Sequence, residues 1–449
     1  MTMLQRTRHA ARAALLILTL LSLSLIAGCD YVGFYSRQTA WRAMYENQPR
    51  MSFIQRFAPG DSILVSGSIA NVEEWRGPLL LAAVSSQYRE NEIVALTTVR
   101  NPRDGYTLFL PKGDYALFLF ADLNGNGLFE RNELVGQASV IVDSAGSRAD
   151  GVLTPPPIVV DYTQPGKTVF RMRVRVQAAS YVYPSLDDDF FDPRFGNEGL
   201  YNPASLMAHT QGFLFGLEDY DVNKTTVLFV HGIGGTPRDW KFYAEGLDRR
   251  RFQPFFLYYP SGMPLDKISS LLAQVISSLD RSSRKSSHRI VLAAHSMGGL
   301  IALSAIQKLA AEGLPSSLAL YCSLSTPYDG SESARKGVET APLVVPVWQD
   351  IAMGSEFLKK QQSQPFPQHL PFYLFFTYND PSAFKLGESG DGSVTLRSQL
   401  TPAMQGAATK IMGFNESHEG LLNSKAGRDA FLQLLDRVPL PETGTGTHQ

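Results

Sequence analysis

The chain has little cysteine and almost no excess of charge. Its 449 residues include only Cys29 and Cys322, whose surroundings differ so much that the sequence gives no support for a disulfide framework. Lysine and arginine number 41 against 42 aspartates and glutamates, which leaves a formal net charge of -1. No basic stretch with interleaved aromatic residues occurs, so we expect no nucleic-acid partner.

The apolar run near the start of the chain is too short for a comfortable membrane span. Residues 13–27 are apolar but fall short of the roughly 20 residues that a spanning helix needs. They follow Arg6, Arg8 and Arg12 and lead into Cys29. A basic segment, a short apolar segment and small residues before the cysteine predict a secretory signal.

This segment resembles the signal of bacterial lipoproteins. The resemblance implies that residues 1–28 are removed and that acyl chains such as palmitate are attached to Cys29, which then anchors the mature chain to a membrane. The protein would face the periplasm of a bacterial cell envelope. Asp30 resembles an inner-membrane retention signal, with the outer membrane as the alternative. An ordinary cleaved signal peptide or a signal anchor is the competing interpretation.

Length and composition indicate more than one folded domain. A chain of 449 residues exceeds the usual single-domain size, and 44% hydrophobic with 18% charged residues is typical of globular proteins. We place a tether at residues 29–58, an all-β domain at 59–177 and a catalytic domain at 178–438. Residues 439–449 are expected to be a disordered tail.

The all-β domain is predicted from the pattern of its residues. Between about Asp61 and Gln177, short runs of β-forming residues alternate with turn residues. This spacing predicts a small β-sandwich. Residues 105–115, followed by 122–127, resemble the transthyretin-like or carboxypeptidase-regulatory-like accessory domains of secreted proteins. The resemblance implies a domain that does no chemistry.

One loop of this domain fits a calcium-binding pattern. Asp122, Asn124, Asn126, Gly127 and Glu133 occupy positions 1, 3, 5, 6 and 12 of an EF-hand-type loop. A strand precedes the loop instead of a helix, and only two of the side-chain ligands are carboxylates. The pattern therefore predicts at most a weak structural calcium site. A plain turn between two strands is the alternative.

The strongest motif lies in the second half of the chain. Residues 226–230 form a buried-strand type of run that ends at the glycine-rich segment 231–237, whose backbone amides can face a ligand. A second such run, 289–294, leads through Ser296 into a helical pattern that begins at Leu300. Strand, tight turn and helix are the context of a nucleophile elbow, with Ser296 as the nucleophile.

An elbow needs small residues two positions before and after the nucleophile, because strand and helix approach closely there. Ala294 and Gly298 fill these positions. From about Thr225 to Asp436 the sequence resembles α/β-hydrolases, in particular lipases and esterases that include acylglycerol lipases and deacylases of glycolipid anchors. Ala294 departs from the glycine of the family pattern. The resemblance implies an α/β fold with a mostly parallel sheet and helices on both faces.

A serine nucleophile needs a base and an orienting carboxylate, which in this superfamily follow in the order Ser, Asp, His. His418, in a loop between an expected strand and the last helix, is the expected base, whereas His369 has the surroundings of a surface turn. Asp391 lies in an Asp-Gly-x-Val segment that resembles the acid loop of these lipases. Asp380 is the alternative acid.

The remaining candidates have supporting roles. The family mechanism implies that the backbone amides of Ile233 and Met297 stabilise the oxyanion. We expect His231 and His295 to pack structurally without reacting. Cys322, in an apolar run, is expected to be a small buried core residue.

The expected activity is hydrolysis of carboxylic esters without a cofactor. Lipid or acyl esters are favoured because an apolar insertion between Tyr328 and Leu370 is placed to form a lid. Acyl transfer with the same triad is one alternative. A non-catalytic envelope binding protein on the same scaffold is the other.

Overall fold

The computed structural model describes residues 62–439 apart from short internal gaps. These gaps are residues 74–76, 78, 86–91, 100–101, 127, 144, 148–151, 169–172, 176–181, 202, 211–212, 283–287, 342–343 and 379–387. The predicted signal, Cys29, Asp30, the tether, Gly127, Asp380 and residues 440–449 therefore lie outside the described residues. No helix within the described ranges is long and apolar enough to cross a membrane.

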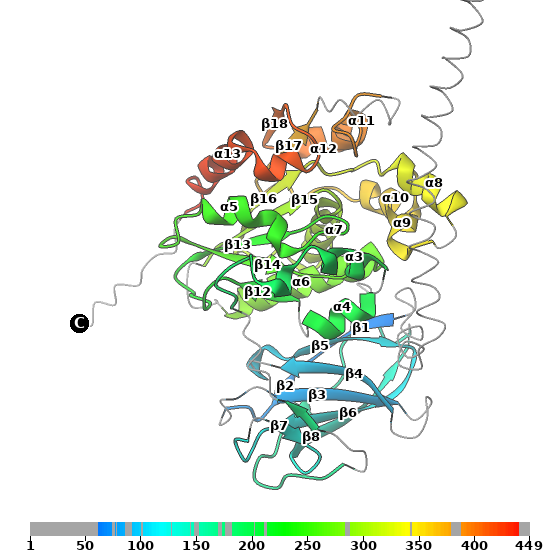
Figure 1. The fold of residues 1–449 in the computed structure, drawn as a ribbon, viewed down its shortest axis with the longest axis vertical. Helices are drawn as coiled ribbons and strands as arrows, with labels where there is room; N and C mark the ends of the chain where they lie inside the picture. Colours follow the sequence, from blue (N-terminus) through cyan, green and yellow to red (C-terminus); the bar gives the residue numbers. More distant parts are fainter. Residues whose placement is uncertain are drawn as a thin grey trace, which may run out of the picture.

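The β-rich part of the chain contains two main sheets (Figure 1). The antiparallel sheet has the order β4 (Glu92–Val99), β3 (Leu79–Ser85), β6 (Gly113–Ala121) and β8 (Leu134–Val142). The second sheet has the order β5 (Tyr106–Pro111), β1 (Ser62–Gly67) and β9 (Val152–Leu153). Two short pairs join β2 (Ile69–Ala70) to β10 (Ile158–Val159) and β7 (Leu128–Glu130) to β11 (Arg173–Arg175).

The core of this domain is built from alternating side chains. Tyr115, Leu117 and Leu119 of β6 are buried in one cluster with Leu64 of β1 and Leu110 of β5. A spacing of two residues places such side chains on one face of a strand, where two sheets can bury them against each other. The expected all-β region is present.

The second half of the chain is built on a seven-stranded sheet. Its order is β12 (Leu214–Gly216), β14 (Phe252–Leu257), β13 (Thr225–Val230), β15 (Ile290–His295), β16 (Leu318–Leu324), β17 (Phe372–Thr377) and β18 (Lys410–Phe414). β12 runs antiparallel to β14, and the other neighbours are parallel. β13, β14 and β15 are buried throughout. Such continuous burial is typical of a parallel sheet covered on both faces.

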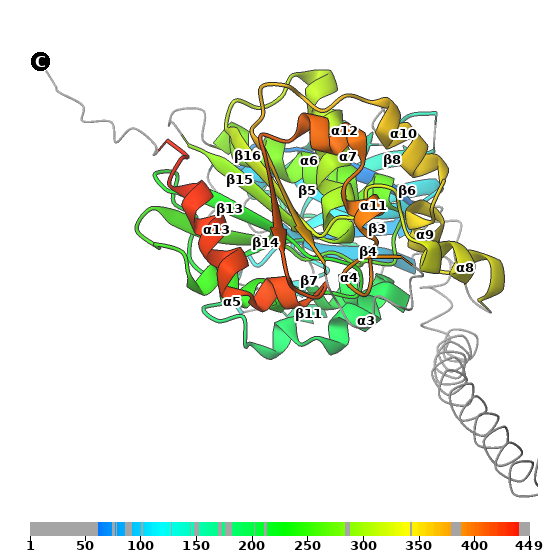
Figure 2. The ribbon, with the colours of Figure 1, turned by 90° about the horizontal axis from the view of Figure 1, so that it is seen from above.

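Helices cover both faces of this sheet (Figure 2). α6 (Leu265–Ser282) and α7 (Met297–Glu312) share a core with one face, and α5 (Lys241–Glu245) and α13 (Lys425–Leu435) share a core with the other. Alternate residues of β13 supply the two cores: Leu228 and Val230 the first, Val227 and Phe229 the second. This arrangement confirms the predicted α/β fold class.

Short helical segments fill the connections. They are η1 (Pro102–Asp104), η2 (Asp189–Phe191), α3 (Arg194–Tyr201), α4 (Pro203–Thr210), η3 (Pro237–Trp240), α8 (Glu332–Thr340), α9 (Pro346–Ile351), α10 (Glu356–Ser363), α11 (Leu396–Gln399), α12 (Pro402–Ala407) and η5 (Gly420–Asn423). The predicted lid insertion thus contains α8, α9 and α10, between β16 and β17.

The two halves of the chain pack against each other. β1 contacts α6, and Phe109 of β5 meets Phe213 edge to face, with ring centroids 5.8 Å apart. β11 ends at Arg175, whereas Val182 already bridges to Gly216 of the seven-stranded sheet. Among the described residues, Arg175 thus belongs to the β-rich half and Val182 to the half with the seven-stranded sheet.

Candidate active site

Ser296 lies at the sharp turn between β15 and α7. Its backbone adopts φ 54° and ψ -129°, a region that costs a non-glycine residue about 1–3 kcal/mol. The N–H of Ser296 donates to the carbonyl of Leu324 at 2.8 Å, which ties the turn to the neighbouring strand. The helix begins at Met297, earlier than the predicted start at Leu300, because the turn feeds directly into it.

Close packing at this turn explains the small residues around Ser296. A Cβ on Gly298 would lie 2.5 Å from the carbonyl oxygen of His231 and 2.7 Å from that of Val230. A larger residue would push the helix away from the glycine-rich loop. Ala294 is fully buried in β15, in register with Val230 and Ser323 of the neighbouring strands. The fold accommodates its methyl group, so the departure from glycine leaves the turn intact.

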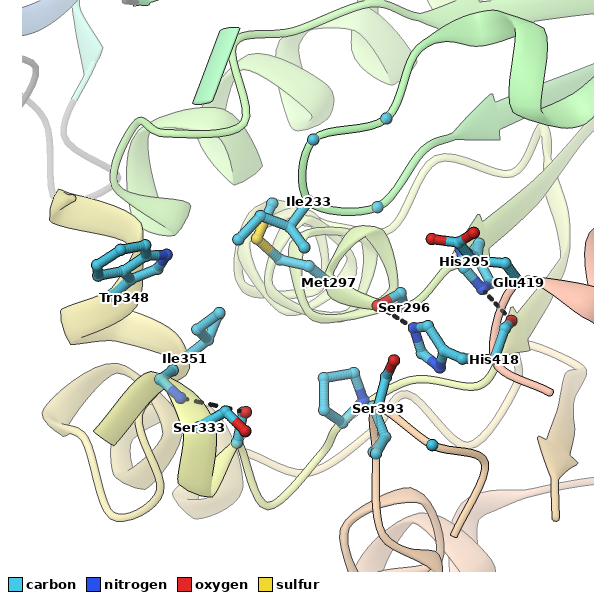
Figure 3. Close-up of a pocket in the computed structure, with 18 of the residues that line it drawn as sticks. Ile233, His295, Ser296, Met297, Ser333, Trp348, Ile351, Ser393, His418 and Glu419 are labelled. Carbon is cyan, nitrogen blue, oxygen red and sulfur yellow. Dashed lines mark hydrogen bonds between the residues drawn. The ribbon is translucent and has the colours of Figure 1, made fainter. Parts of the chain in front are cut away.

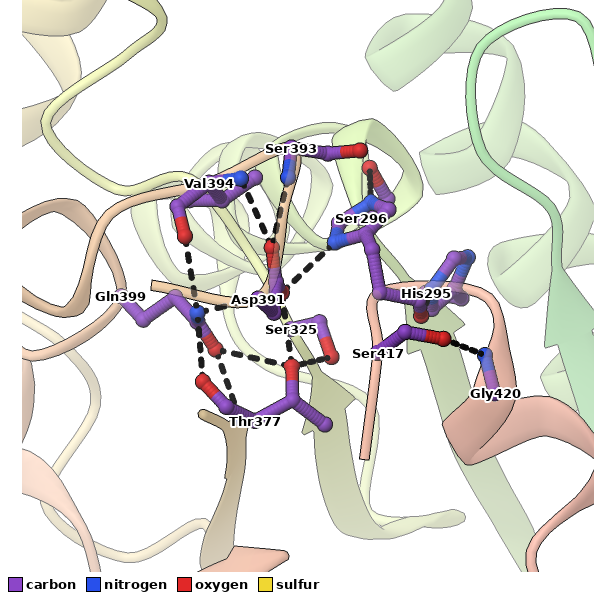
Figure 4. Close-up of polar contacts among 11 residues, drawn as sticks. His295, Ser296, Ser325, Thr377, Asp391, Ser393, Val394, Gln399, Ser417 and Gly420 are labelled. Carbon is purple, nitrogen blue, oxygen red and sulfur yellow. Dashed lines mark hydrogen bonds and ion pairs between the residues drawn. The ribbon is translucent and has the colours of Figure 1, made fainter. Parts of the chain in front are cut away.

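Three side chains form one hydrogen-bonded chain beside this turn (Figure 4). Nε2 of His418 lies 2.8 Å from Oγ of Ser296, and Nδ1 lies 2.8 Å from Oδ2 of Asp391. Because an ionised carboxylate only accepts, Nδ1 carries the hydrogen and Nε2 accepts the serine hydroxyl. The structure thus brings together the residues that the sequence singled out as nucleophile, base and acid.

The carboxylate of Asp391 is fully buried and accepts several hydrogen bonds (Figure 4). Its Oδ1 accepts from the N–H groups of Ser393 at 3.0 Å and Val394 at 2.7 Å. Its Oδ2 accepts from the hydroxyl of Thr377 at 2.6 Å and the amide of Gln399 at 3.2 Å, in addition to the imidazole. These hydrogen bonds compensate for the loss of hydration that the buried carboxylate suffers.

These hydrogen bonds decide the charge of Asp391. Burial alone would raise its pKa, but the hydrogen bonds from His418, Thr377 and Val394, with the attraction to His418, hold the pKa below the usual 3.8. The carboxylate is therefore ionised at neutral pH and fixes the orientation of the imidazole.

The residues that support Asp391 could not be recognised as a group in the sequence. The hydroxyls of Thr377 and Ser325 lie 2.7 Å apart at the ends of β17 and β16. Gln399, on α11, accepts the N–H of Thr377 at 2.9 Å and donates to its carbonyl at 3.1 Å. The sequence feature that could have indicated Thr377 and Ser325 is their place at the carboxyl ends of strands. Polar residues at the carboxyl ends of parallel strands meet at one edge of the sheet.

The glycine-rich segment after β13 lies against Ser296 (Figure 3). A Cβ on Gly232 would lie 3.1 Å from Cβ of Ser296, so glycine allows the loop to approach. Gly234 has φ +65°, and its N–H donates to Oγ of Ser261 at 2.9 Å. The two predicted oxyanion residues, Ile233 and Met297, line the same cavity as Ser296.

His231 holds the start of this loop. Its ring stacks on Tyr259 with centroids 4.1 Å apart, and its Nδ1 donates to the carbonyl of Gly232 at 2.8 Å. The hydroxyl of Tyr259 donates to the carbonyl of His231 at 2.7 Å. Burial lowers the pKa of His231 to about 4, so the ring is neutral at neutral pH. These contacts fit the structural role expected of His231.

A cavity of about 860 Å³ contains the exposed face of Ser296 (Figure 3). One wall carries Ile233 and Met297, and the facing wall carries Trp348 and Ile351 of α9. These four side chains give each wall an apolar part. The cavity lies within the size range of sites for small organic ligands.

Acidic groups line another part of this cavity. Asp239 and Glu419 are both lining residues. Burial and the nearby charge of Glu419 raise the pKa of Asp239 to about 6, although its Oδ2 accepts the N–H of Thr236 at 3.1 Å. The charge of the cavity therefore changes within the mildly acidic range.

The predicted lid insertion is fastened to the body of the domain. The amide of Gln361 on α10 donates to the carbonyl of Leu300 at 2.7 Å, and the amide of Gln307 on α7 donates to the carbonyl of Gln361 at 2.9 Å. On α9, the side chain of Asp350 accepts the N–H of Leu265 at 2.7 Å. In the described part of the insertion, α9 and α10 are thus held to the body of the domain, and residues of α8 and α9 line the cavity.

The predicted calcium loop forms a turn in which its expected ligands bind backbone amides. Oε1 of Glu133 accepts from the N–H of Leu123 at 3.0 Å, and Oε2 accepts from another amide at 2.9 Å. Asp122 and Asn124 both accept from the N–H of Asn126, at 3.1 and 2.9 Å. Across the described ranges, no group of three or more His, Cys, Asp or Glu is arranged to hold a metal. Calcium binding stays a prediction from the sequence.

The side chains of His369, Asp329 and Cys322 are not among those that line the cavity. His369 is exposed in a turn before β17. Asp329 pairs with Arg397 at 3.1 Å. Cys322 is a fully buried free cysteine in β16, and burial raises the pKa of its thiol.

Comparisons with known proteins find a matching family model and similar solved structures. Residues 222–363 match the model of a family described as "Putative serine esterase (DUF676)". No curated protein sequence matches the chain. A solved structure to which it is similar is the mature lipase BlEst2 of Bacillus licheniformis, with 17% identity, a TM-score of 0.42, and coverage of 50% of this chain and 98% of that one. Another is the phospholipase PlaB of Legionella pneumophila, with 19% identity, a TM-score of 0.33, and coverage of 39% and 44%.

Proposed function

We propose that this chain, a serine hydrolase whose C-terminal domain is an α/β-hydrolase of the lipase and esterase superfamily, cleaves lipid or other acyl esters at Ser296. The observation that carries the proposal is the unbroken hydrogen-bonded path from Ser296 through His418 to Asp391, 2.8 Å at each step. A nucleophile, a base and an ionised, buried acid are the groups that acyl transfer through a serine requires.

In the proposed reaction His418 takes the proton of Ser296 while Oγ attacks the acyl carbonyl. The tetrahedral intermediate collapses as His418 gives this proton to the leaving alcohol oxygen, and an acyl-enzyme remains. His418 then deprotonates water, which attacks the acyl-enzyme, and the carboxylic acid leaves as Ser296 regains its proton. Asp391 stabilises the imidazolium that forms in each half of the cycle.

The developing oxyanion is assigned to the backbone N–H groups of Ile233 and Met297. Ile233 belongs to the loop that lies against Ser296, and Met297 is the first residue of α7. The N-terminus of a helix carries partial positive charge, which favours an anion beside Met297.

A fluorophosphonate probe tests the nucleophile. We expect the folded wild-type protein to react once and peptide mapping to place the adduct on Ser296, because His418 activates only that hydroxyl. Heat-denatured protein is the control and should not react. Failure of the folded protein to react, or an adduct on another serine, would contradict the proposal.

The fluorophosphonate label also allows a test of the proposed lipid anchor at Cys29, because it shows in which cell fraction the protein lies. The anchor is inferred from residues 6–29 of the sequence alone. In bacterial cells we expect the labelled wild-type protein in the membrane fraction, and the labelled Cys29→Ser variant in the soluble fraction or unprocessed. An unchanged distribution between the two would argue against lipidation.

The apolar walls of the cavity favour substrates with an acyl chain. Trp348 packs against α8, where a Cβ on Gly337 would lie 3.2 Å from its ring, and it lies across the cavity from Met297 (Figure 3). Each methylene buried on binding contributes about 0.8 kcal/mol, roughly fourfold in kcat/KM. Acyl esters should therefore react better as the chain lengthens, until it fills the cavity.

Trp348→Ala should enlarge the cavity, so that the acyl length with the highest kcat/KM becomes longer. The measurement is kcat/KM for p-nitrophenyl esters of increasing acyl length. Phe366→Ala is a matched control, since Phe366 belongs to the same insertion but packs on Tyr321 and Phe372, outside the cavity. An identical chain-length profile in wild type and Trp348→Ala would show that this wall does not bind the acyl chain.

A further inference from the structure

His295 lies where three parts of the site meet. It directly precedes Ser296, is only 5% exposed, and its ring centroid lies 4.8 Å from that of His418. A Cβ added to Gly232 would lie 3.4 Å from its Nδ1. The side chain thus lies between the turn that carries the nucleophile, the loop that carries the base and the oxyanion loop (Figure 3).

The imidazole of His295 makes one directed hydrogen bond. Its Nε2 lies 3.0 Å from the main-chain carbonyl oxygen of His418. Because a carbonyl only accepts, Nε2 carries the hydrogen and donates it. The N–H of His418, in turn, donates to the carbonyl of Asp391 at 3.0 Å. Both polar groups of the His418 backbone are therefore held, one by the acid residue and one by the neighbour of the nucleophile.

We propose that His295 is a positioning residue that fixes the backbone of His418 relative to Ser296. The hydrogen bond between Nε2 of His418 and Oγ of Ser296 depends on where the loop around residue 418 lies, and His295 links this loop to the turn that carries Ser296. The proposal rests on the ester hydrolysis proposed above. It assigns to His295 a role beyond the packing expected from the sequence.

The chemistry of His295 suits this role because its ring remains neutral. Burial and the neighbouring charge of His418 lower its pKa to about 3, against the opposing effects of the His418 carbonyl and of Asp391. His231 is the other titratable group that acts on it. A neutral ring neither repels the imidazolium formed at His418 nor takes up the proton of Ser296.

A matched pair of variants tests the hydrogen bond. His295→Gln and His295→Met have side chains of similar length, but only glutamine has an N–H that can reach the carbonyl of His418. We expect His295→Met to lower kcat by on the order of 10- to 100-fold with KM nearly unchanged, because a misplacement of about 1 Å can cost 10²-fold. His295→Gln should retain most of the wild-type kcat.

His288 supplies the control pair. It is also buried, and its Nε2 lies 3.3 Å from the hydroxyl of Tyr220, in a part of the domain remote from the cavity. His288→Gln and His288→Met should differ in melting temperature and agree in kcat. If His295→Gln and His295→Met have the same kcat, His295 does not act through this hydrogen bond.

Wild-type labelling separates this inference from the proposed function. If the wild-type protein does not react with the fluorophosphonate, the ester hydrolase itself is wrong. If the wild-type protein reacts and the His295→Met variant, folded by its melting curve, reacts at the same rate, only the role of His295 is overturned.

Discussion

Replacing Ser296 by alanine is expected to lower kcat by roughly 10⁶-fold, the loss typical of removing the nucleophile from a serine triad. The hydroxyl oxygen is the atom that forms the acyl-enzyme, and it is the atom that Nε2 of His418 approaches at 2.8 Å. KM should change little, because the substrate is bound mainly by the cavity walls that the substitution leaves intact. The measurement is steady-state hydrolysis of the best p-nitrophenyl ester, with the melting temperature recorded alongside.

Ser304→Ala is the matched control for this prediction. Ser304 is a buried serine of α7, and its hydroxyl donates to Oγ of Ser269 at 3.1 Å, away from the cavity. This variant should lose some stability and keep the wild-type kcat. A Ser296→Ala variant that retained more than about a thousandth of the wild-type kcat would be incompatible with a covalent mechanism at this residue.

Asp391→Asn should lower kcat by roughly 10⁴-fold, with the protein still folded. Every neighbour of the carboxylate acts as a donor, namely the amides of Ser393 and Val394, the hydroxyl of Thr377, the amide of Gln399 and the imidazole. The NH₂ of an asparagine must face one of these donors. Where it faces His418, it favours the tautomer with the hydrogen on Nε2, which cannot accept the proton of Ser296.

Asp329→Asn provides the comparison for this substitution. Its carboxylate pairs with Arg397 at 3.1 Å and takes no part in the hydrogen bonds of His418. We expect this variant to keep the wild-type kcat and to lose at most about 1 kcal/mol of stability, the usual contribution of a partly exposed ion pair. A loss in Asp391→Asn no greater than that in Asp329→Asn would remove Asp391 from the triad and reopen the question of which carboxylate orients His418.

The fold could be predicted from the sequence where burial leaves a local pattern. β13 and β15 are buried on both faces, so each contains an unbroken apolar run, residues 227–230 and 290–294, by which it can be recognised as a parallel strand. The local pattern predicts the start of α7 at Leu300, whereas the helix begins at Met297. Its first residues, Met297, Gly298 and Gly299, are fixed by the contacts of the turn, and Gly298 is a weak helix former.

The site could be predicted to the extent that its residues belong to short motifs. Ser296 was identified from a five-residue pattern between a strand and a helix, and His418 from its place before the last helix. The resemblance of its loop to the acid loop of lipases favours Asp391 over Asp380. Residues 379–387 are outside the described residues, so the geometry bears on Asp391 alone.

The sequence by itself determined the class of fold and the residues with the chemical groups for acyl transfer. Both can be recognised from local patterns of about ten residues. Only the tertiary structure decided how these groups are held. Thr377 lies 14 residues from Asp391 in the chain, and His295 lies 123 residues from the carbonyl that it binds. Such contacts follow from the order of the strands and the packing of their loops, and no local pattern encodes them. The same holds for Trp348, which faces the cavity only because α9 packs beside α8.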